Sequence, residues 1–186
     1  MKRERALNIG LVVCIAVLTI VLMSIVVAPN FSANPSAALV VYGKVNVVHI
    51  RDGQVLMNVT SRNLITNAGK DFIARQLGST SPAPNGANYI ALSTDSTTPS
   101  ASDTTLPGEI TYGGLARSQG TYSHEDGTNT FTIQKTFTAT TSFTGVQKAG
   151  LFTAPTGGTM LAVNTFTPIN LQNGDQLQIT WTITIT

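Results

Sequence analysis

The final stretch of the chain, residues 174–186, constrains the fold more than any other part of the sequence. The apolar residues that alternate there with Gln and Thr are Leu177, Ile179, Trp181, Ile183 and Ile185. Side chains of a β-strand point alternately to opposite faces, so this pattern predicts a strand with one apolar and one polar face. Because an apolar face that includes a tryptophan has to be covered, we expect the preceding segments to build a β-sandwich around this strand.

Similar patterns recur between turn signals in the rest of the chain. They predict strands at residues 38–50, 55–61, 88–92, 130–143, 145–153 and 160–167, with two shorter segments at 109–112 and 114–121. The strand at 130–143 places Phe131, Ile133, Phe137, Ala139 and Phe143 on one face. We therefore predict a mainly β fold, an antiparallel sandwich of about eight strands of the Ig-like or jelly-roll-like kind.

Residues 63–78 depart from the strand pattern. Asn67 can cap a helix there, and Gly78 can end it. Phe72, Ile73 and Leu77 would then share one side. The sequence predicts this as the one short helix of the region that follows residue 37.

An apolar segment precedes the predicted sandwich. Residues 6–28 carry no charge, and at ~1.5 Å per helical residue they can span a bilayer core of ~30 Å. Positions along this predicted membrane helix are Ala6, Leu11, Ile15, Leu18, Leu22 and Val26. The basic residues before it should stay cytoplasmic, which places the rest of the chain outside. The predicted organisation is a basic tail and helix at 1–28, a linker at 29–37 and an extracytoplasmic domain at 38–186.

Two alternative interpretations of residues 1–28 stay open. One is a cleaved secretion signal, although Pro29 should block cutting after Ala28. The other starts from Arg5-Ala6-Leu7, which resembles the junction cut by archaeal prepilin peptidases. That resemblance implies a retained helix that bundles with others in a filament core. The partner of this segment is therefore either membrane lipid or a filament core.

The charge content excludes some functions and favours others. Charged residues make up 11% of the chain and the net charge is +2, much of it from Lys2, Arg3 and Arg5. The rest lacks the basic surface that nucleic-acid binding requires. Low charge reduces repulsion between copies, so we expect a homo-oligomer or polymer. Residues 38–50 follow a flexible linker, and we hypothesise that this strand is exchanged between subunits.

No motif for catalysis or metal binding stands out. His49 and His124 are the only histidines, they are far apart, and we expect both at the surface. There is no G-x-S-x-G elbow and no calcium-loop spacing among the carboxylates. The sequence therefore predicts a non-enzymatic protein without catalytic residues, metal or cofactor.

Binding and modification sites are the remaining candidates. Asp95 and Asp103 lie in a long Ser/Thr/Pro-rich loop, and Tyr112 follows it, so these residues could form a binding surface for a glycan or receptor. The alternative is that the carboxylates are solvated or cap turns and that Tyr89, Tyr112 and Tyr122 serve in packing. Asn30 and Asn58 begin N-glycosylation sequons on the predicted outer side.

An ordered series of segments carries a resemblance to a known class of proteins. The segments are N-L-I-T-N-A-G-K-D-F-I-A-R-Q-L from Asn63, N-Y-I-A-L-S-T from Asn88, K-T-F-T-A-T-T-S-F-T-G-V-Q-K-A-G-L-F from Lys135, and the stretch from Gly157 to Thr184. From about residue 38 onward the chain resembles a domain of tail-fibre and other virion structural proteins of tailed phages and archaeal viruses. The resemblance implies a structural β-sandwich without enzymatic activity. Tail proteins ordinarily lack a membrane segment, and in this the chain departs from them.

These observations combine into one expectation about function. We expect a non-enzymatic structural subunit of an extracellular surface assembly, either a membrane-anchored virion protein or a pilus or filament subunit, with the sandwich facing outward. The alternative is a receptor- or glycan-binding module like those of tail fibres. In either case we expect it at the surface of a cell or virion.

Overall fold

The computed structural model of this chain describes residues 38–81 and 85–186. They belong to one compact unit, Ala38–Thr186. The predicted membrane or filament helix, the linker and the sequon at Asn30 lie outside the described residues. Within the described ranges, no helix has the length and apolar character needed to cross a membrane.

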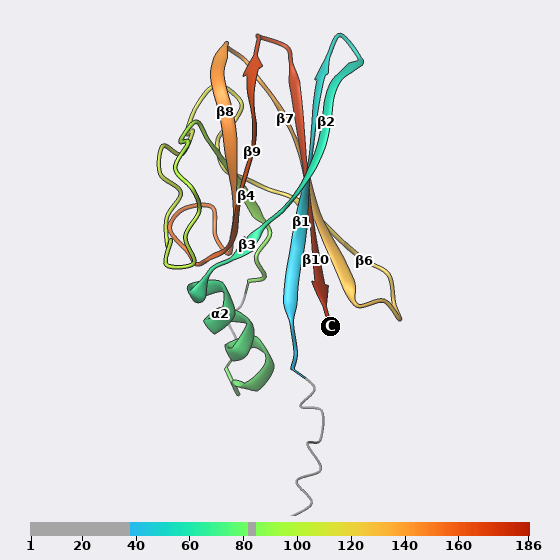
Figure 1. The fold of residues 1–186 in the computed structure, drawn as a ribbon, viewed down its shortest axis with the longest axis vertical. Helices are drawn as coiled ribbons and strands as arrows, with labels where there is room; N and C mark the ends of the chain where they lie inside the picture. Colours follow the sequence, from blue (N-terminus) through green and yellow to red (C-terminus); the bar gives the residue numbers. More distant parts are fainter. Residues whose placement is uncertain (1–37, 82–84) are drawn as a thin grey trace, which may run out of the picture. The chain divides into compact units, whose positions relative to one another are not determined.

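In the described residues, ten strands form two five-stranded sheets in which every neighbouring pair is antiparallel (Figure 1). Sheet A has the strand order β2-β1-β10-β7-β6, and sheet B has the order β3-β9-β8-β4-β5. The strands are β1 Val41–Arg51, β2 Gln54–Arg62, β3 Leu64–Ile65, β4 Tyr89–Ser93, β5 Ser118–Gln119, β6 Thr121–His124, β7 Thr130–Thr138, β8 Phe143–Phe152, β9 Met160–Leu171 and β10 Gln176–Ile185. The expectation of a mainly β fold with two antiparallel sheets is confirmed, with ten strands rather than about eight.

The final strand lies at the centre of sheet A, between β1 and β7. Trp181 pairs in register with Val45 on one side and Ile133 on the other, and none of these side chains is more than 1% exposed. The predicted alternation holds along β10, where Leu177, Ile179 and Ile183 are also buried. Ile185 departs from it and is 39% exposed, because it lies at the end of the strand.

One continuous hydrophobic core joins the inner faces of the two sheets. It combines sheet A residues such as Trp181 and Phe137 with sheet B residues such as Leu92 and Leu151. Short crossing segments close the sandwich at its edges, from β2 into β3 and from β5 into β6. Gly120 lies in the second crossing, where an added Cβ would come within 2.6 Å of the Ile133 side chain.

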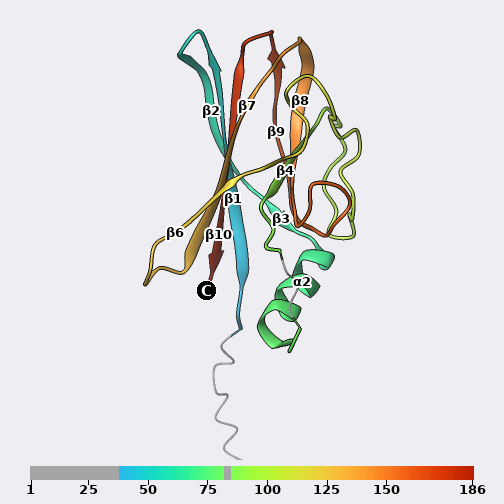
Figure 2. The same ribbon diagram turned by 180° about the vertical axis from the view of Figure 1, so that it is seen from behind.

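The outer face of sheet B is covered by the loop at residues 94–117, which Figure 2 shows beside β8 and β4. Leu106 of this loop packs into a second, smaller apolar cluster on that face. The other buried members of that cluster are Ala91, Phe152, Met160 and Val163. Sheet B is therefore buried on both sides along much of its length.

The single described helix, α2, spans Asn67–Gly78. Its N-cap is Thr66, not Asn67 as predicted: the Thr66 hydroxyl accepts a hydrogen bond from Gly69 N at 2.9 Å. The preceding Leu64 and Ile65 form the short strand β3, which was not predicted, because they pair with β9. Gly69 lets the helix backbone approach β9, since an added Cβ would lie 2.2 Å from the carbonyl oxygen of Leu161.

The predicted strand at residues 130–143 is two strands in the structure. β7 ends at Thr138, and the chain then passes to sheet B, where β8 begins at Phe143. Ala139 and Phe143 are nevertheless buried in the same core as Ile133 and Phe137. The apolar alternation in the sequence therefore continues through the change of sheet, which hides the break.

The strand that we hypothesised to be exchanged between subunits pairs within its own chain. β1 lies between β2 and β10, and its register with β10 runs from Val41–Ile185 to Ile50–Gln176. Beyond the strand, Val40 N donates to Thr186 O at 2.6 Å. Removing this strand would expose the core around Trp181.

Candidate functional site

An apolar groove opens where β1 and β10 meet helix α2. The cavity has a volume of ≈ 400 Å³. Helix α2 contributes Phe72, Ile73 and Leu77 to it. Sheet A contributes Val41, Tyr122, Phe131, Ile133, Ile183 and Ile185. A second depression of ≈ 550 Å³ shares Val41, Ile73 and Leu77 with it and extends to Leu39 and Val40. We call the two together the apolar groove.

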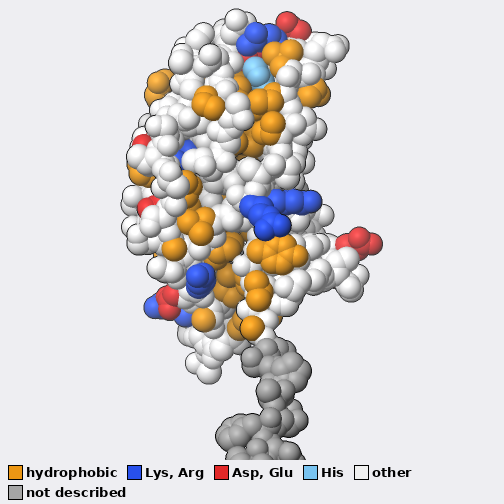
Figure 3. Space-filling view, viewed as in Figure 1, with side chains coloured by type: hydrophobic (Ala, Val, Ile, Leu, Met, Phe, Trp, Pro, Cys, Tyr) orange, Lys and Arg blue, Asp and Glu red, His pale blue; other side chains and the backbone are white. Residues whose placement is uncertain are grey.

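The rim of the apolar groove exposes large hydrophobic side chains. Leu77 is 72% exposed, Leu39 is 61% exposed and Tyr122 is 58% exposed. Figure 3 shows hydrophobic side chains gathered over this end of the domain. Contiguous exposed apolar surface of this kind is typical of sites that bind another molecule. The predicted helix face of Phe72, Ile73 and Leu77 thus borders a groove, and only part of it is buried.

Local interactions hold the two sides of the apolar groove in place. The Thr66 hydroxyl donates to Met160 O at 2.5 Å, and Thr66 N donates to Leu161 O at 3.1 Å, so the start of α2 is fixed to β9. On the other side, Asn129 Nδ2 donates to Ile185 O at 2.9 Å. The groove is therefore part of the folded domain rather than a gap between loose segments.

The loop residues predicted as a binding surface have separate partners. Asp95 accepts hydrogen bonds from Thr97 and from Lys148 Nζ, and Lys148 itself is buried. The hydrogen bond from Lys148 lowers the pKa of Asp95 below its ordinary value. Asp103 accepts from Ser100 N at 2.8 Å, as expected for a turn-capping carboxylate.

Tyr112, the third residue of that predicted surface, is 64% exposed. Its ring packs against Phe143 in a tilted arrangement with 5.3 Å between ring centroids. The structure thus ties Asp95 to sheet B, Asp103 to its own turn and Tyr112 to β8. A binding surface formed by the three stays a prediction.

Arg117 joins the loop at residues 94–117 to the loop between β8 and β9. Its guanidinium donates to both carboxylate oxygens of Glu109, at 2.8 and 2.6 Å. It also donates to the carbonyl oxygens of Ala154 and Gly157, and it lies 3.6 Å above the ring of Phe152. Because the guanidinium makes four hydrogen bonds within the domain and packs on a ring, we interpret Arg117 as a structural link.

We expected His49 at the surface, but the structure buries it, and the residue is only 6% exposed. Its Nε2 lies 2.9 Å from Asp175 Oδ2. Arg51 donates to both oxygens of Asp175, at 2.8 and 2.7 Å. The Arg51 hydrogen bond is the main reason why the pKa of Asp175 falls far below its ordinary value, although burial opposes it. This cluster ties β1 to the turn before β10.

The other predicted site residues have these positions. His124 ends β6, is exposed as expected, and its Nδ1 lies 2.8 Å from Thr130 O. Asn58 is exposed on β2 and accepts a hydrogen bond from Asn46 at 2.7 Å, so its glycosylation stays a prediction. In residues 38–81 and 85–186, no group of three or more His, Cys, Asp or Glu side chains could hold a metal ion.

Comparison with protein families gives one match, to the family described as podophage GP4 fiber I protein gp80, over residues 63–185. This chain belongs to that family. The matched residues include all of sheet B, helix α2 and strands β6, β7 and β10 of sheet A. The hairpin of β1 and β2 precedes the match. Comparison with curated proteins gives no match.

Proposed function

We propose that this chain is a structural subunit of a fibre on the virion surface and that its copies associate through the apolar groove. The match to a podophage fibre family over residues 63–185 carries this proposal. It supports a virion structural protein rather than an enzyme.

The apolar groove supports the second half of the proposal. Leu39, Leu77 and Tyr122 at its rim are each more than half exposed. A second copy of the chain is the occupant that a fibre requires, because fibres are built from repeated subunits. Burial of apolar side chains between copies would stabilise the assembly by about 25 cal/mol for each Å² removed from water.

Photo-crosslinking tests the association directly. A photo-crosslinking residue at position 77 of the full chain should link copies into dimers or larger species. The matched control is position 56 on β2, where Leu56 is 53% exposed but lies outside the apolar groove. Crosslinks of equal yield from both positions, or none from position 77, would refute association through this surface.

A charge substitution adds a second readout. Leu39→Asp with Leu77→Asp should lower the mass of the assembly measured by light scattering, because carboxylates would enter an apolar interface. Leu56→Asp should leave that mass unchanged. The location is tested by immunoelectron microscopy: antibodies to this chain should label a fibre on the native particle, and labelling elsewhere would overturn the fibre assignment.

The role of residues 6–28 is a separate part of the proposal. We propose that they anchor the fibre domain in a membrane or in a filament core, because they form a long uncharged apolar stretch after basic residues. The intact mass of the native chain tests this. A mass that includes residues 7–28 supports the anchor, and a chain that begins near residue 29 contradicts it. The measurement also separates the interpretations of cleavage after Ala6 and after Ala28.

A further inference from the structure

The strands of sheet A contain Lys and Arg residues but no Asp or Glu residue. Their charged side chains are Lys44 and Arg51 of β1, Arg62 of β2 and Lys135 of β7, apart from the two histidines. Arg51 is neutralised by Asp175. The sheet therefore has a positive local field.

Lys44 and Arg62 lie directly opposite each other in the register of β1 and β2. Both are exposed, and neither takes part in an ion pair among the described residues. Like charges at directly opposed positions of a sheet destabilise it. Because neither residue forms an ion pair among the described residues, the two charges are available to bind an anionic ligand.

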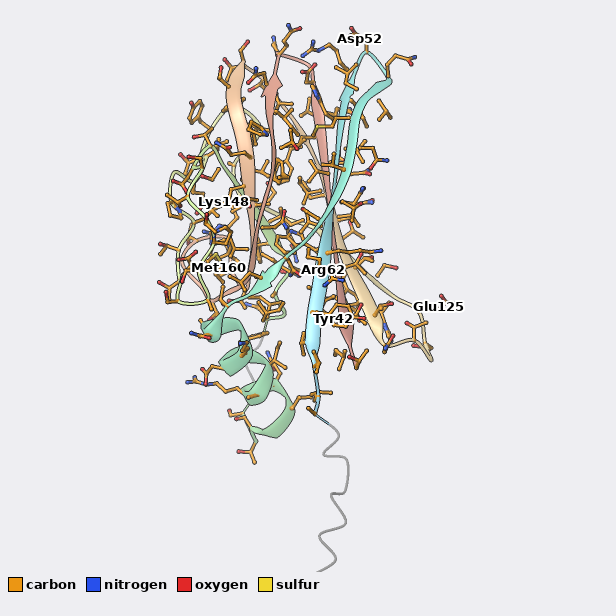
Figure 4. All side chains as sticks on the ribbon, in the orientation of Figure 1. Tyr42, Asp52, Arg62, Glu125, Lys148 and Met160 are labelled. Carbon is orange, nitrogen blue, oxygen red and sulfur yellow. The ribbon has the colours of Figure 1, made fainter. Side chains whose placement is uncertain are left out.

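An aromatic ring lies next to this pair. Tyr42 is 52% exposed and shares the outer face with Lys44, two residues further along β1. Figure 4 shows Tyr42 and Arg62 near each other on sheet A, with Asp52 at the far end of the hairpin, and Figure 3 shows basic side chains beside hydrophobic ones there. On β10, Thr184 pairs with Tyr42 and Thr182 pairs with Lys44.

We propose that Tyr42, Lys44 and Arg62 form a binding site for an acidic saccharide, a pyranose that carries a carboxylate. The planar guanidinium of Arg62 can donate two parallel hydrogen bonds to a carboxylate, and Lys44 adds a second charge. The Tyr42 ring offers a flat apolar surface on which the sugar ring can stack. The hydroxyls of Thr182 and Thr184 supply neutral partners for sugar hydroxyls.

The surroundings favour a saccharide over other polyanions. The outer positions of β10 and β7 next to the site are Thr and Gln, such as Thr180 and Gln134, which hydrogen-bond to each other at 3.0 Å. A nucleic acid would call for a longer run of cations along its phosphates. Two cations, one exposed ring and an uncharged polar surround match one charged sugar and its neutral neighbours.

Binding of the full chain to an oligogalacturonate, a polymer of carboxylated pyranoses, tests the site. Calorimetry should show binding to this probe and much weaker binding to a neutral galactose oligomer of equal length. Arg62→Gln and Lys44→Gln should each weaken binding by about tenfold, as expected for a lost charge-assisted hydrogen bond. Tyr42→Ala should weaken binding to the saccharide but leave binding of acetate unchanged.

Lys135→Gln is the matched control, because it removes one positive charge from the same sheet. Lys135 pairs with the inward-facing Ile179 and therefore lies on the opposite face of the sheet from the proposed site. It should leave saccharide binding unchanged. Equal weakening by Lys135→Gln and Arg62→Gln, or equal affinity for the neutral oligomer, would overturn the proposal. So would a result in which Arg62→Gln leaves saccharide binding intact and instead releases contacts between copies, for example with the acidic turn at Glu125 and Asp126. These outcomes do not depend on association through the apolar groove, so the two proposals can fail separately.

Discussion

The two sheets share one core but differ on their outer faces. Many outer positions of sheet A carry Thr, Gln and Asn side chains, some of which hydrogen-bond to one another, as Gln178 does to Thr136 at 3.3 Å. The outer face of sheet B lies under a loop and is apolar, with Phe152 and Met160 at most 1% exposed. The difference shows that two layers, sheet B and the loop at residues 94–117, lie on one side of the core and one layer, sheet A, lies on the other. Sheet A is thus the sheet that can present a wide, regular face to another molecule.

The largest expected effect comes from the layer that both sheets share. Trp181→Ala should lower the free energy of unfolding by about 3–5 kcal/mol, because it leaves a large cavity between the sheets. Thr182→Ala, the next residue on β10, should lower it by less than about 1 kcal/mol, since this side chain is on the outer face. Denaturant unfolding measures both. Similar losses for the two variants would contradict the assignment of inner and outer faces.

The next effect tests whether the loop at residues 94–117 is a true layer. Leu106 is 5% exposed, and Leu106→Ala should lower the free energy of unfolding by about 2–4 kcal/mol. Leu56→Ala is the control, because Leu56 is 53% exposed on sheet A and its loss should have an effect below about 1 kcal/mol. If the loop were only loosely attached, the two substitutions would have equal effects.

A smaller effect, limited to acid, distinguishes the buried Asp175 from exposed carboxylates. The pKa of Asp175 is lowered in the folded chain, mainly by Arg51, so its ionised form stabilises the fold. That contribution is complete above the ordinary aspartate pKa of about 3.9, and it is lost as the pH falls from there through the folded-state value. Between about pH 5 and about pH 2, the native chain should lose more stability than the variant Asp175→Asn.

Urea unfolding across that pH range measures the difference. Asp52→Asn is the control, because Asp52 is exposed in the β1–β2 turn and asparagine tolerates its positive φ of 50°. This variant should follow the acid dependence of the native chain. A native chain whose stability does not change with acid would show that the cluster of Asp175, Arg51 and His49 has little weight.

The contrast between the sheets also explains which parts of the fold could be predicted from sequence. In β10 each apolar residue is followed by Thr or Gln, so the inner face could be read directly. In β9 the first residues, Met160, Leu161, Ala162 and Val163, are all buried, and a strand covered on both sides has no alternation to read. Residues 93–107 were predicted as an irregular loop, and residues 109–112 and 114–121 were predicted as short strands. In the structure the loop continues to residue 117, and only Ser118–Gln119 of β5 and the first residue of β6 lie in strands. The buried Leu106, Ile110 and Leu115 are separated by polar residues and glycines, so no local pattern indicated that this stretch is packed.

The candidate sites depended on contacts between distant residues. His49 was predicted at the surface because a histidine near a strand end is usually exposed, and its partner Asp175 is 126 positions away. The apolar groove combines α2, β1 and β10, which no local pattern brings together. Lys44 and Arg62 likewise become neighbours only through the register of the β1–β2 hairpin. The available signal was the absence of any Asp or Glu from the predicted strands of that hairpin, which sequence reasoning did not use.

The family match starts at Asn63, yet β10 lies against β1, which precedes the match. In a chain trimmed to the matched residues, the ten residues of β10 would form an edge strand whose backbone amide and carbonyl groups on that side are unpaired. Such an edge is a template for another strand. The hairpin of β1 and β2 therefore covers this edge of β10, and association between copies is left to the other surfaces of the domain.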